Sequence, residues 1–286
     1  MTTQCYLCHL ERNVELARSF GDEETAAAFT RDLMSLYVSA PAGVSAPWFT
    51  PHVNRLLQKY YNISPDRFRQ EKLDSNAYIM ERFSHIQGLV RAAEDPVFAA
   101  LQYAILGNYI DFSALRGEVS FDTLDEMLEK ARNLPIPEDT YRQFCEELAG
   151  GKRFLYLTDN AGEIGFDRIL AEQLHLRYPH LEITFCVRGG PAQNDATRED
   201  AAAVGIPFPV IDNGNTIPGT QIEELSEEAI HALTTADVIL SKGQGNAETL
   251  LGCGYNIYYA FLIKCARFVE QFKKEKLTPM FLRERA

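Results

Sequence analysis

The stretch Thr158-Asp159-Asn160-Ala161-Gly162-Glu163 decides the fold, because it joins two segments of different character. The apolar run at residues 153–157 predicts a buried parallel strand, and residues 164–176 predict a helix. An Asp-Asn pair at the carboxyl end of a strand, with a glycine opening the next helix, is typical of α/β sheets that hold an oxygen-ligated metal or a phosphate. We therefore expect a ligand site at this end of a parallel sheet.

The rest of the chain divides into a helical half and an alternating half. From Lys152 onward, short apolar runs alternate with helical segments, which predicts a largely parallel sheet covered by helices on both faces. The expected strands are residues 154–157, 183–187, 208–211, 238–240 and 257–263. Before Lys152, helical patterning predicts helices over residues 22–38, 66–93 and 96–109, from Ser120, and from Pro137 to Gly150. We expect a helical subdomain over residues 1–150 and an α/β domain over residues 151–286.

Composition limits the class of protein. The 286 residues include 46% hydrophobic and 24% charged residues, an ordinary soluble mixture. The net charge of −12 argues against a surface that coats nucleic acid or binds an anionic membrane, although a metal can still make a local site attract an anion. Neither a membrane-spanning run nor a secretory signal is evident, so we expect a cytoplasmic protein whose six cysteines are thiols or metal ligands.

The first candidate site element is the Asp159-Asn160 pair. Carboxylate and amide oxygens are hard ligands that suit Mg²⁺, Mn²⁺ or a similar ion, but Asp and Asn also form turns and helix caps. Glu163 is either a first-turn acid of the next helix or a group aimed at a substrate or at metal-bound water.

The second element follows the predicted strand at residues 183–187. Here Asp195 either caps a helix or supplies a second carboxylate to the same ion. The glycine pair that begins at Gly189 allows backbone N–H groups to approach a phosphate, and Asn194 lies in the same loop. Arg188 pairs with an anion or forms a surface or interdomain ion pair.

The third element is Lys242-Gly243-Gln244-Gly245-Asn246, after the predicted strand at residues 238–240. A lysine at a strand end, followed by Gly-x-Gly and a helix N-terminus, is typical of a phosphate cradle, although this segment matches neither the P-loop nor the dinucleotide fingerprint. The Gly-x-Gly is a weak signal alone, and it gains weight from lying at the same sheet edge as the other two elements.

Three further segments have open interpretations. Residues 211–220 form a turn-rich loop that also lies at the proposed edge. Asn108 and Asp111, three apart on one predicted helix face, look into a cleft or cap a helix end. Cys5-Tyr6-Leu7-Cys8-His9 fits a haem-attachment pattern, which we reject because no export signal accompanies it. A structural, redox or metal role for Cys5 and Cys8 remains open, on a short segment before the first long helix.

Taken together and in order, these motifs resemble those of the damage-control phosphatases, a family of metal-dependent phosphatases. The resemblance rests on Asp-Asn-Ala-Gly-Glu, Arg-Gly-Gly-Pro…Asn-Asp-Ala-Thr and Lys-Gly-Gln-Gly-Asn, and the segments at Gly107 and Asp212 also fit. The Cys-x-x-Cys points to the prokaryotic branch. The resemblance covers nearly the whole chain, and it implies an all-helical N-terminal portion before a Rossmann-like three-layer α/β/α domain.

The resemblance also implies roles for individual residues. It implies metal ligands at Asp159, Asn160 and Asp195 and a phosphate-binding lysine at Lys242, whereas Glu163 matches a substrate-contacting position only loosely. Ala247 stands where an aromatic residue is expected, which affects the shape of the pocket. The basic motif that selects sugar phosphates in the eukaryotic branch is not evident, so that preference is not assigned.

The resulting hypothesis is hydrolysis of a small phosphomonoester with a divalent cation (Mn, Mg, Co or Ni) as cofactor. Activated water, oriented by an acidic residue, is favoured over covalent attack by a carboxylate. The expected catalytic residues are Asp159, Asp195 and Lys242, and the expected substrate-binding residues are Asn108, Glu163, Arg188, Gly189, Asn194, Lys242 and Gly243. The alternatives are an S-adenosylmethionine-dependent small-molecule methyltransferase and a non-enzymatic protein that binds phosphorylated metabolites.

Overall fold

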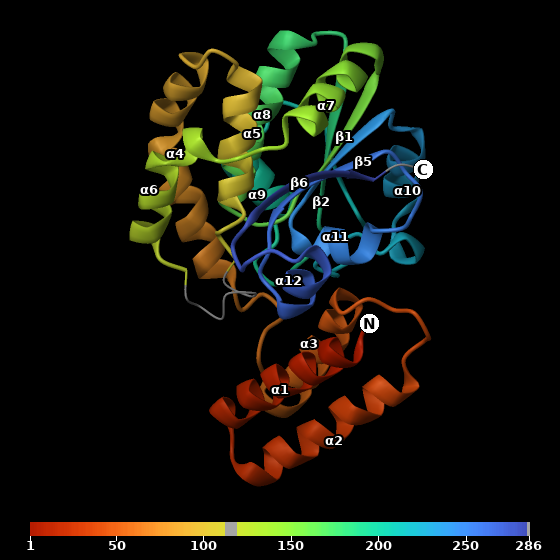
Figure 1. Cartoon of the computed structure of the whole chain (residues 1–286). Helices are drawn as coiled ribbons and strands as arrows, with labels where there is room; N and C mark the ends of the chain where they lie inside the picture. The colour runs from red at the N-terminus through yellow and green to blue at the C-terminus, as the bar shows by residue number, and fades with distance from the viewer. Residues whose placement is uncertain (112–118, 285–286) are drawn as a thin grey trace.

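A six-stranded sheet lies between layers of helices in the computed structural model, which describes residues 1–111 and 119–284 (Figure 1). The order of the strands across the sheet is β3-β2-β1-β4-β5-β6; the first five are parallel and β6 is antiparallel to β5. The strands are β1 Arg153–Leu157, β2 Glu182–Val187, β3 Val210–Asp212, β4 Val238–Lys242, β5 Ile257–Leu262 and β6 Pro279–Glu284. The predicted α/β fold with a largely parallel sheet is confirmed.

Helices cover both faces of the sheet because its central strands are apolar on both sides. Side chains at alternate positions, such as Tyr156 and Leu240, face one helical layer, and their neighbours Leu155 and Ile239 face the other. The first layer comprises α4 Arg69–Arg91, α5 Pro96–Gly107, α6 Phe121–Glu129, α7 Glu138–Gly150 and α8 Glu163–Arg177. The second layer comprises α10 Glu227–Thr235, α11 Gln244–Leu250 and α12 Ala266–Phe272, and α9 Arg198–Ala203 packs beside β3.

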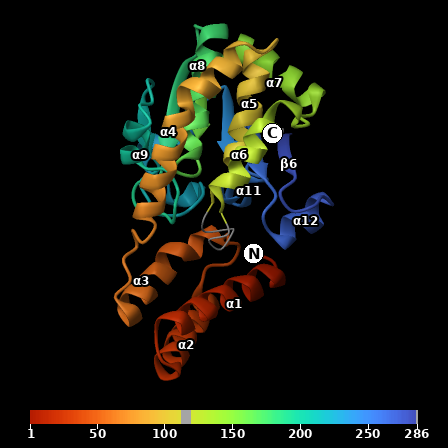
Figure 2. The same ribbon diagram turned by 90° about the vertical axis from the view of Figure 1, so that its left-hand side faces the viewer.

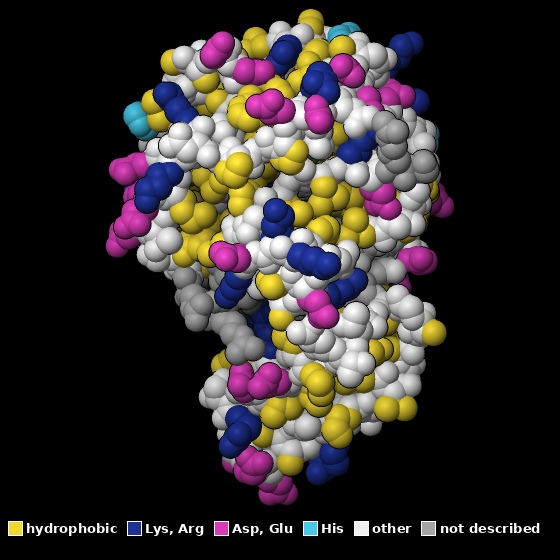
Figure 3. Space-filling view, in the orientation of Figure 1, with side chains coloured by type: hydrophobic (Ala, Val, Ile, Leu, Met, Phe, Trp, Pro, Cys, Tyr) yellow, Lys and Arg dark blue, Asp and Glu magenta, His cyan; other side chains and the backbone are white. Residues whose placement is uncertain are grey.

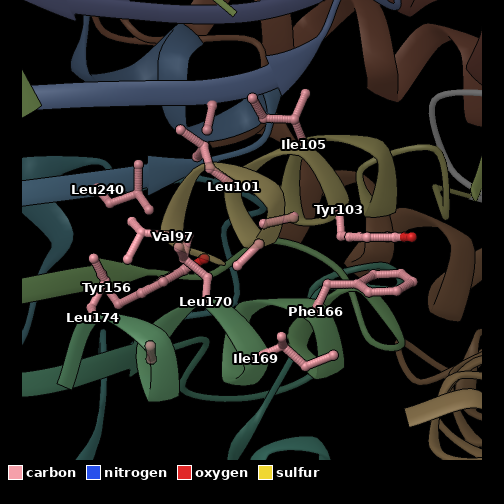
Figure 4. Packing of buried hydrophobic residues seen from close by; sticks show 14 of the residues in the cluster. Val97, Leu101, Tyr103, Ile105, Tyr156, Phe166, Ile169, Leu170, Leu174 and Leu240 are labelled. Carbon is pink, nitrogen blue, oxygen red and sulfur yellow. The ribbon is translucent and has the colours of Figure 1, made fainter. Parts of the chain in front are cut away.

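Helix α5 is apolar on nearly all sides and is therefore buried between the sheet and its neighbouring helices. Figure 4 shows its residues packed against Phe166 and Leu170 of α8 and against side chains of the sheet. A Cβ at Gly107 would lie 2.5 Å from Phe166 Cδ2, so only glycine permits this close approach of α5 to α8. The packing places the end of α5, and Asn108 directly after it, beside the end of β1.

The first three helices have a separate hydrophobic core. Helices α1 Thr3–Phe20, α2 Glu23–Ser39 and α3 Thr50–Tyr61 pack around Phe29, Leu33 and Phe49. This N-terminal lobe lies at the same end of the sheet as α11 and α12 (Figures 1 and 2). It contacts the loop after β3, where Ser45 Oγ donates a hydrogen bond of 2.9 Å to Gln221 Oε1. Helices α4–α7 share their core with the sheet. The domain boundary proposed at residue 150 stays a prediction.

Most expected elements are present, and four were missed. Ser120 caps α6 at the predicted start of that helix, whereas α1, α3, α12 and β6 were not predicted. Within residues 1–111 and 119–284, none of the helices combines the length and apolar character needed to cross a bilayer. On the face shown in Figure 3, Lys and Arg side chains are interspersed with Asp and Glu rather than gathered in one basic band.

Candidate functional site

The candidate site lies where the sheet changes its direction of winding. The connection from β1 leads to β2 on one side, whereas β4, the other neighbour of β1, leads to β5 on the opposite side. Ligands of open α/β sheets bind in the crevice at such a point, beyond the carboxyl ends of the strands. Asp159 and Asn160 follow β1 here, and Gly243 follows β4. The structure therefore brings the strand ends that carry these residues to one edge of the sheet, while their role as a site stays a prediction.

Two amide side chains hold the carboxylate of Asp159. Asn108 Nδ2 donates to Asp159 Oδ2 at 2.9 Å, and Asn160 Nδ2 donates to the same oxygen at 2.8 Å. The other proton of each amide goes to Glu163 Oε2, at 3.0 and 2.8 Å. Asn108 is the C-cap of α5 and Asp111 lies beyond the helix, so the prediction that both share a helix face is wrong. Both oxygen and nitrogen of the Asn108 amide bond within the protein, which gives it a positioning role.

Asp195 is brought to Asp159 by pairing of the two turns. Asn160 and Asp195 form an antiparallel bridge, and Arg188 Nε donates to Asp195 Oδ2 at 2.7 Å. Arg188 is 2% exposed, so it is neither a surface ion pair nor open to a substrate. Asp195 does not cap α9, because Thr197 does so in a capping box.

Backbone amides predicted to bind phosphate already have partners. Gly189 N donates to the Asn215 carbonyl at 2.9 Å and to Asn213 Oδ1 at 2.9 Å, which ties the loop after β3 to the end of β2. Gly243 N donates to the Ala260 carbonyl at 3.1 Å. These two N–H groups are therefore not available to a phosphate. Gly243 is instead required for space, because a Cβ there would overlap the carboxylate of Asp159.

Lys242 does not point beyond the carboxyl end of its strand. Its ammonium group is fully buried and donates to Glu163 Oε1 at 2.7 Å, to Asp167 Oδ1 at 2.6 Å and to the Ala104 carbonyl at 2.9 Å. These three acceptors match the three donors of an ammonium group, so none is left for a phosphate in this arrangement. Burial alone would lower the pKa of Lys242, but the Asp167 and Glu163 carboxylates raise the pKa to about 12.

Sequence reasoning missed a second lysine at the same edge. Lys264 lies two residues beyond β5, and its Nζ is 2.7 Å from Asp111 Oδ2. Burial raises the pKa of Asp159, and the positive charge of Lys264 partly opposes this rise, which places the ammonium group in the field of that carboxylate. The predicted strand at residues 257–263 ends at the same edge of the sheet, so the residue that follows it, Lys264, could have been identified from the sequence.

Negative charge is in excess at the site. Burial, followed by the charges of Asp195 and Glu163, raises the pKa of Asp159 well above its usual range. Burial also raises the pKa of Asp195 to about 6, although Arg188 opposes this rise. Five carboxylates share the region with three cationic side chains, which leaves an excess of two negative charges when all are ionised. The carboxylates are Asp111, Asp159, Glu163, Asp167 and Asp195, and the cations are Arg188, Lys242 and Lys264.

A divalent cation fits this donor set. No group of three His, Cys, Asp or Glu side chains suited to a metal occurs in the described parts of the chain, so such an ion would depend on Asn160 and on water beside the two aspartates. Mg²⁺ and similar ions bind proteins in this way, through one or two carboxylates and retained water. Asn194 Nδ2 donates to Asn160 Oδ1 at 2.8 Å, and its own buried Oδ1 lacks a hydrogen-bond partner among the described atoms. An oxygen acceptor thus remains available beside the proposed ligands.

The N-terminal cysteines lie in the first turns of α1, not on a short segment before the first helix. Cys5 is half-buried and Cys8 is exposed, and both are free thiols. Thr2 caps the helix by accepting a hydrogen bond from Cys5 N.

The chain is similar to several known proteins along most of its length. A family model described as the damage-control phosphatase ARMT1-like domain matches residues 1–278. A damage-control phosphatase of Archaeoglobus fulgidus is 32% identical over 253 residues, covering 86% of this chain and 85% of the relative. One of Pyrococcus horikoshii is 36% identical over 180 residues, covering 62% of this chain and 61% of the relative.

An uncharacterized protein of Methanocaldococcus jannaschii is 29% identical over 279 residues, covering 93% of this chain and 90% of the relative. The crystal structure of a DUF89-family protein from Pyrococcus horikoshii superposes with a TM-score of 0.80 at 28% identity, covering 99% of this chain and 98% of that one. The resemblance stated from the motifs is thereby confirmed, and the chain belongs to the family of ARMT1-like damage-control phosphatase domains.

Proposed function

We propose that this chain is a metal-dependent phosphatase that hydrolyses small phosphomonoesters. The observation that carries the proposal is the pair of buried aspartates, Asp159 and Asp195, at the switch point of the sheet, where negative charge is in excess. The homologues named damage-control phosphatases support the phosphatase role, and their family is metal-dependent in general.

On the basis of a bound divalent cation, we assign each residue of the site a role. Asp159, Asn160 and Asp195 would hold a divalent cation, which supplies positive charge where the transferred phosphoryl group accumulates negative charge. Lys264 would neutralise another phosphate oxygen, since its ammonium group, now paired with Asp111, lies near Asp159. Asp195 would orient the attacking water, because Glu163 is fully buried and both its oxygens accept hydrogen bonds from the protein. Water attacks phosphorus and gives up a proton, the ester P–O bond breaks, and the leaving oxygen takes up a proton and departs as the alcohol.

The proposal is tested by measuring phosphate release from a panel of sugar phosphates, other phosphorylated metabolites and p-nitrophenyl phosphate. Each is assayed with Mn²⁺, Mg²⁺, Co²⁺ or Ni²⁺. We expect metal-dependent release from at least one compound. Binding of S-adenosylmethionine in calorimetry without phosphate release would favour the methyltransferase instead. Binding of phosphorylated metabolites without any release would favour a non-enzymatic binding protein.

The cysteines of α1 are expected to be dispensable for this activity. Cys5 and Cys8 belong to the N-terminal lobe, and the proposed ligand set is complete without them. The double variant Cys5→Ser/Cys8→Ser should therefore keep its metal-dependent turnover, with at most a lower melting temperature. The rate of p-nitrophenyl phosphate hydrolysis and the melting curve check this together. Lost turnover at unchanged stability and metal content would place the N-terminus in the site.

A further inference from the structure

Lys242 ends β4, but its side chain points under α8 and not beyond the edge of the sheet. Side chains alternate between the faces of a strand, and Lys242 shares its face with Leu240, which packs in the core beneath α5 and α8. The partners of its ammonium group come from these two helices: Ala104 from α5, and Glu163 and Asp167 from α8. The strand therefore delivers this charge to the helical layer.

A continuous set of buried contacts leads from this lysine to the proposed metal ligand. Tyr156 donates its hydroxyl proton to Asp167 Oδ1 at 2.8 Å, and Lys242 donates to the same oxygen. Lys242 also holds Glu163 Oε1, which leaves Oε2 of that carboxylate to accept from two amides. The amides belong to Asn108 and Asn160, and both also donate to Asp159. Tyr156, Asp167, Lys242, Glu163 and Asn108 are all 0% exposed.

We propose that Lys242 is a positioning residue, not a phosphate ligand. With Asp167 and Tyr156 it fixes the Glu163 carboxylate. Glu163 then sets which way the amides of Asn108 and Asn160 point, and these amides present Asp159 to the cation. The inference rests on the proposed function only for the identity of that cation.

The charges explain why the arrangement depends on the lysine. Lys242 lies between two carboxylates that have no exposure to water, Glu163 and Asp167. Removing the cation that contacts both would leave two buried anions uncompensated, which is strongly unfavourable in a protein interior. We expect Glu163 to turn away from its present position. Its contacts with the two amides then change, and Asp159 moves with them.

The test is calorimetric titration of Mn²⁺ into substrate-free protein, which requires no turnover. Lys242→Met and Asp167→Asn should each weaken Mn²⁺ binding by about tenfold or more, because each breaks charged contacts behind Glu163. Tyr156→Phe, which removes one hydroxyl and keeps the ring, should weaken it about threefold to tenfold. A Lys242→Met/Glu163→Gln double variant should lose less affinity than the two single effects combined, since the residues act through one contact.

Lys264→Met is the matched control, because it removes a lysine of the same sheet edge that does not contact Glu163. It should not weaken Mn²⁺ binding but should raise the inhibition constant of inorganic phosphate. Our inference is overturned if Lys242→Met behaves like this control, with unchanged Mn²⁺ affinity and weaker phosphate inhibition. If Lys242→Met fails to fold, the milder variants decide: wild-type Mn²⁺ affinity in both Tyr156→Phe and Asp167→Asn would overturn it equally.

The proposed function can fail separately. Wild-type protein that binds Mn²⁺ but releases no phosphate would refute the proposed phosphatase activity. The Mn²⁺ titrations of the variants would still test the positioning role of Lys242. If wild-type protein binds no metal, crystal structures of substrate-free wild-type protein and Asp167→Asn provide the readout. We expect Asp167→Asn to lose the amide contacts between Glu163 and Asn160; unchanged contacts would contradict the inference.

Discussion

Replacing Gly243 with alanine is expected to abolish metal-dependent turnover. A Cβ at this position would occupy the space of the Asp159 carboxylate, overlapping its Cγ and both oxygens. Gly243 also has a φ of 81°, in the left-handed region that L-residues with a side chain rarely adopt. The carboxylate must therefore leave the position in which Asn108 and Asn160 hold it. We expect activity on p-nitrophenyl phosphate to fall by at least about a hundredfold and Mn²⁺ affinity to fall with it.

Gly254→Ala is the control for backbone strain. Gly254 has a similar φ of 83°, but a Cβ there would meet no atom within 4 Å. The Gly254→Ala substitution should lower the free energy of unfolding by about 1 kcal/mol and leave turnover unchanged. Equal losses in the two variants would show that strain, and not displacement of Asp159, explains the Gly243 result. Wild-type activity in Gly243→Ala would mean that Asp159 has no role at the position seen here.

Asp159→Asn and Asp195→Asn are each expected to reduce turnover by at least about a hundredfold. Either change removes one of the two carboxylates that would hold the cation, while the side chain keeps nearly the same shape. Asp195→Asn should also lower the melting temperature, because the buried guanidinium of Arg188 loses its close partner. Kinetics on p-nitrophenyl phosphate, together with the metal content of each purified variant, measure both effects.

Asp212→Asn provides a matched loss of a carboxylate at the same end of the sheet. Asp212 pairs with Arg198 at a partly exposed site, 2.6 Å away, and contacts neither aspartate of the proposed centre. Its substitution should leave turnover near that of the wild type. Full activity in both Asp159→Asn and Asp195→Asn would refute the assignment of these two residues.

The position of the candidate site could be predicted because it follows from strand order and strand ends. Short apolar runs such as residues 153–157 identify parallel strands, and parallel strands bring their carboxyl ends to one edge. Asp159, two residues beyond the first run, and Asn194, in the loop after the second, are therefore expected to lie near one another. This reasoning needs only the period of the sequence and the rules of crossover connections.

The direction of each side chain could not be predicted so simply. Lys242 was assigned to phosphate because it ends a strand, but the two-residue period places it on the face that carries Leu240. Its partners, Glu163 and Asp167, are one turn apart on α8, and nothing in the sequence shows that this helix lies over the end of β4. Likewise, nothing local to Gly189 indicates that Asn213 accepts its N–H.

The missed elements have weak local signals. In α1 only Asn13 and Ala17 are buried, so the helix shows little apolar periodicity and is stabilised by packing within the lobe. Strand β6 pairs with β5 at the edge of the sheet, and its pairing depends on a partner that the sequence pattern does not identify. In both cases tertiary contacts, more than local preference, determine the structure.

The central claim is that the aspartate pair holds a divalent cation required for phosphomonoester hydrolysis. Its most direct test is the rate of p-nitrophenyl phosphate hydrolysis by protein stripped of metal with a chelator, before and after Mn²⁺, Mg²⁺, Co²⁺ or Ni²⁺ is added back. The account predicts negligible hydrolysis by the stripped protein and recovery with at least one of these ions, a recovery that Asp159→Asn does not show. Undiminished hydrolysis by the stripped wild-type protein, or recovery of equal size in Asp159→Asn, would contradict it.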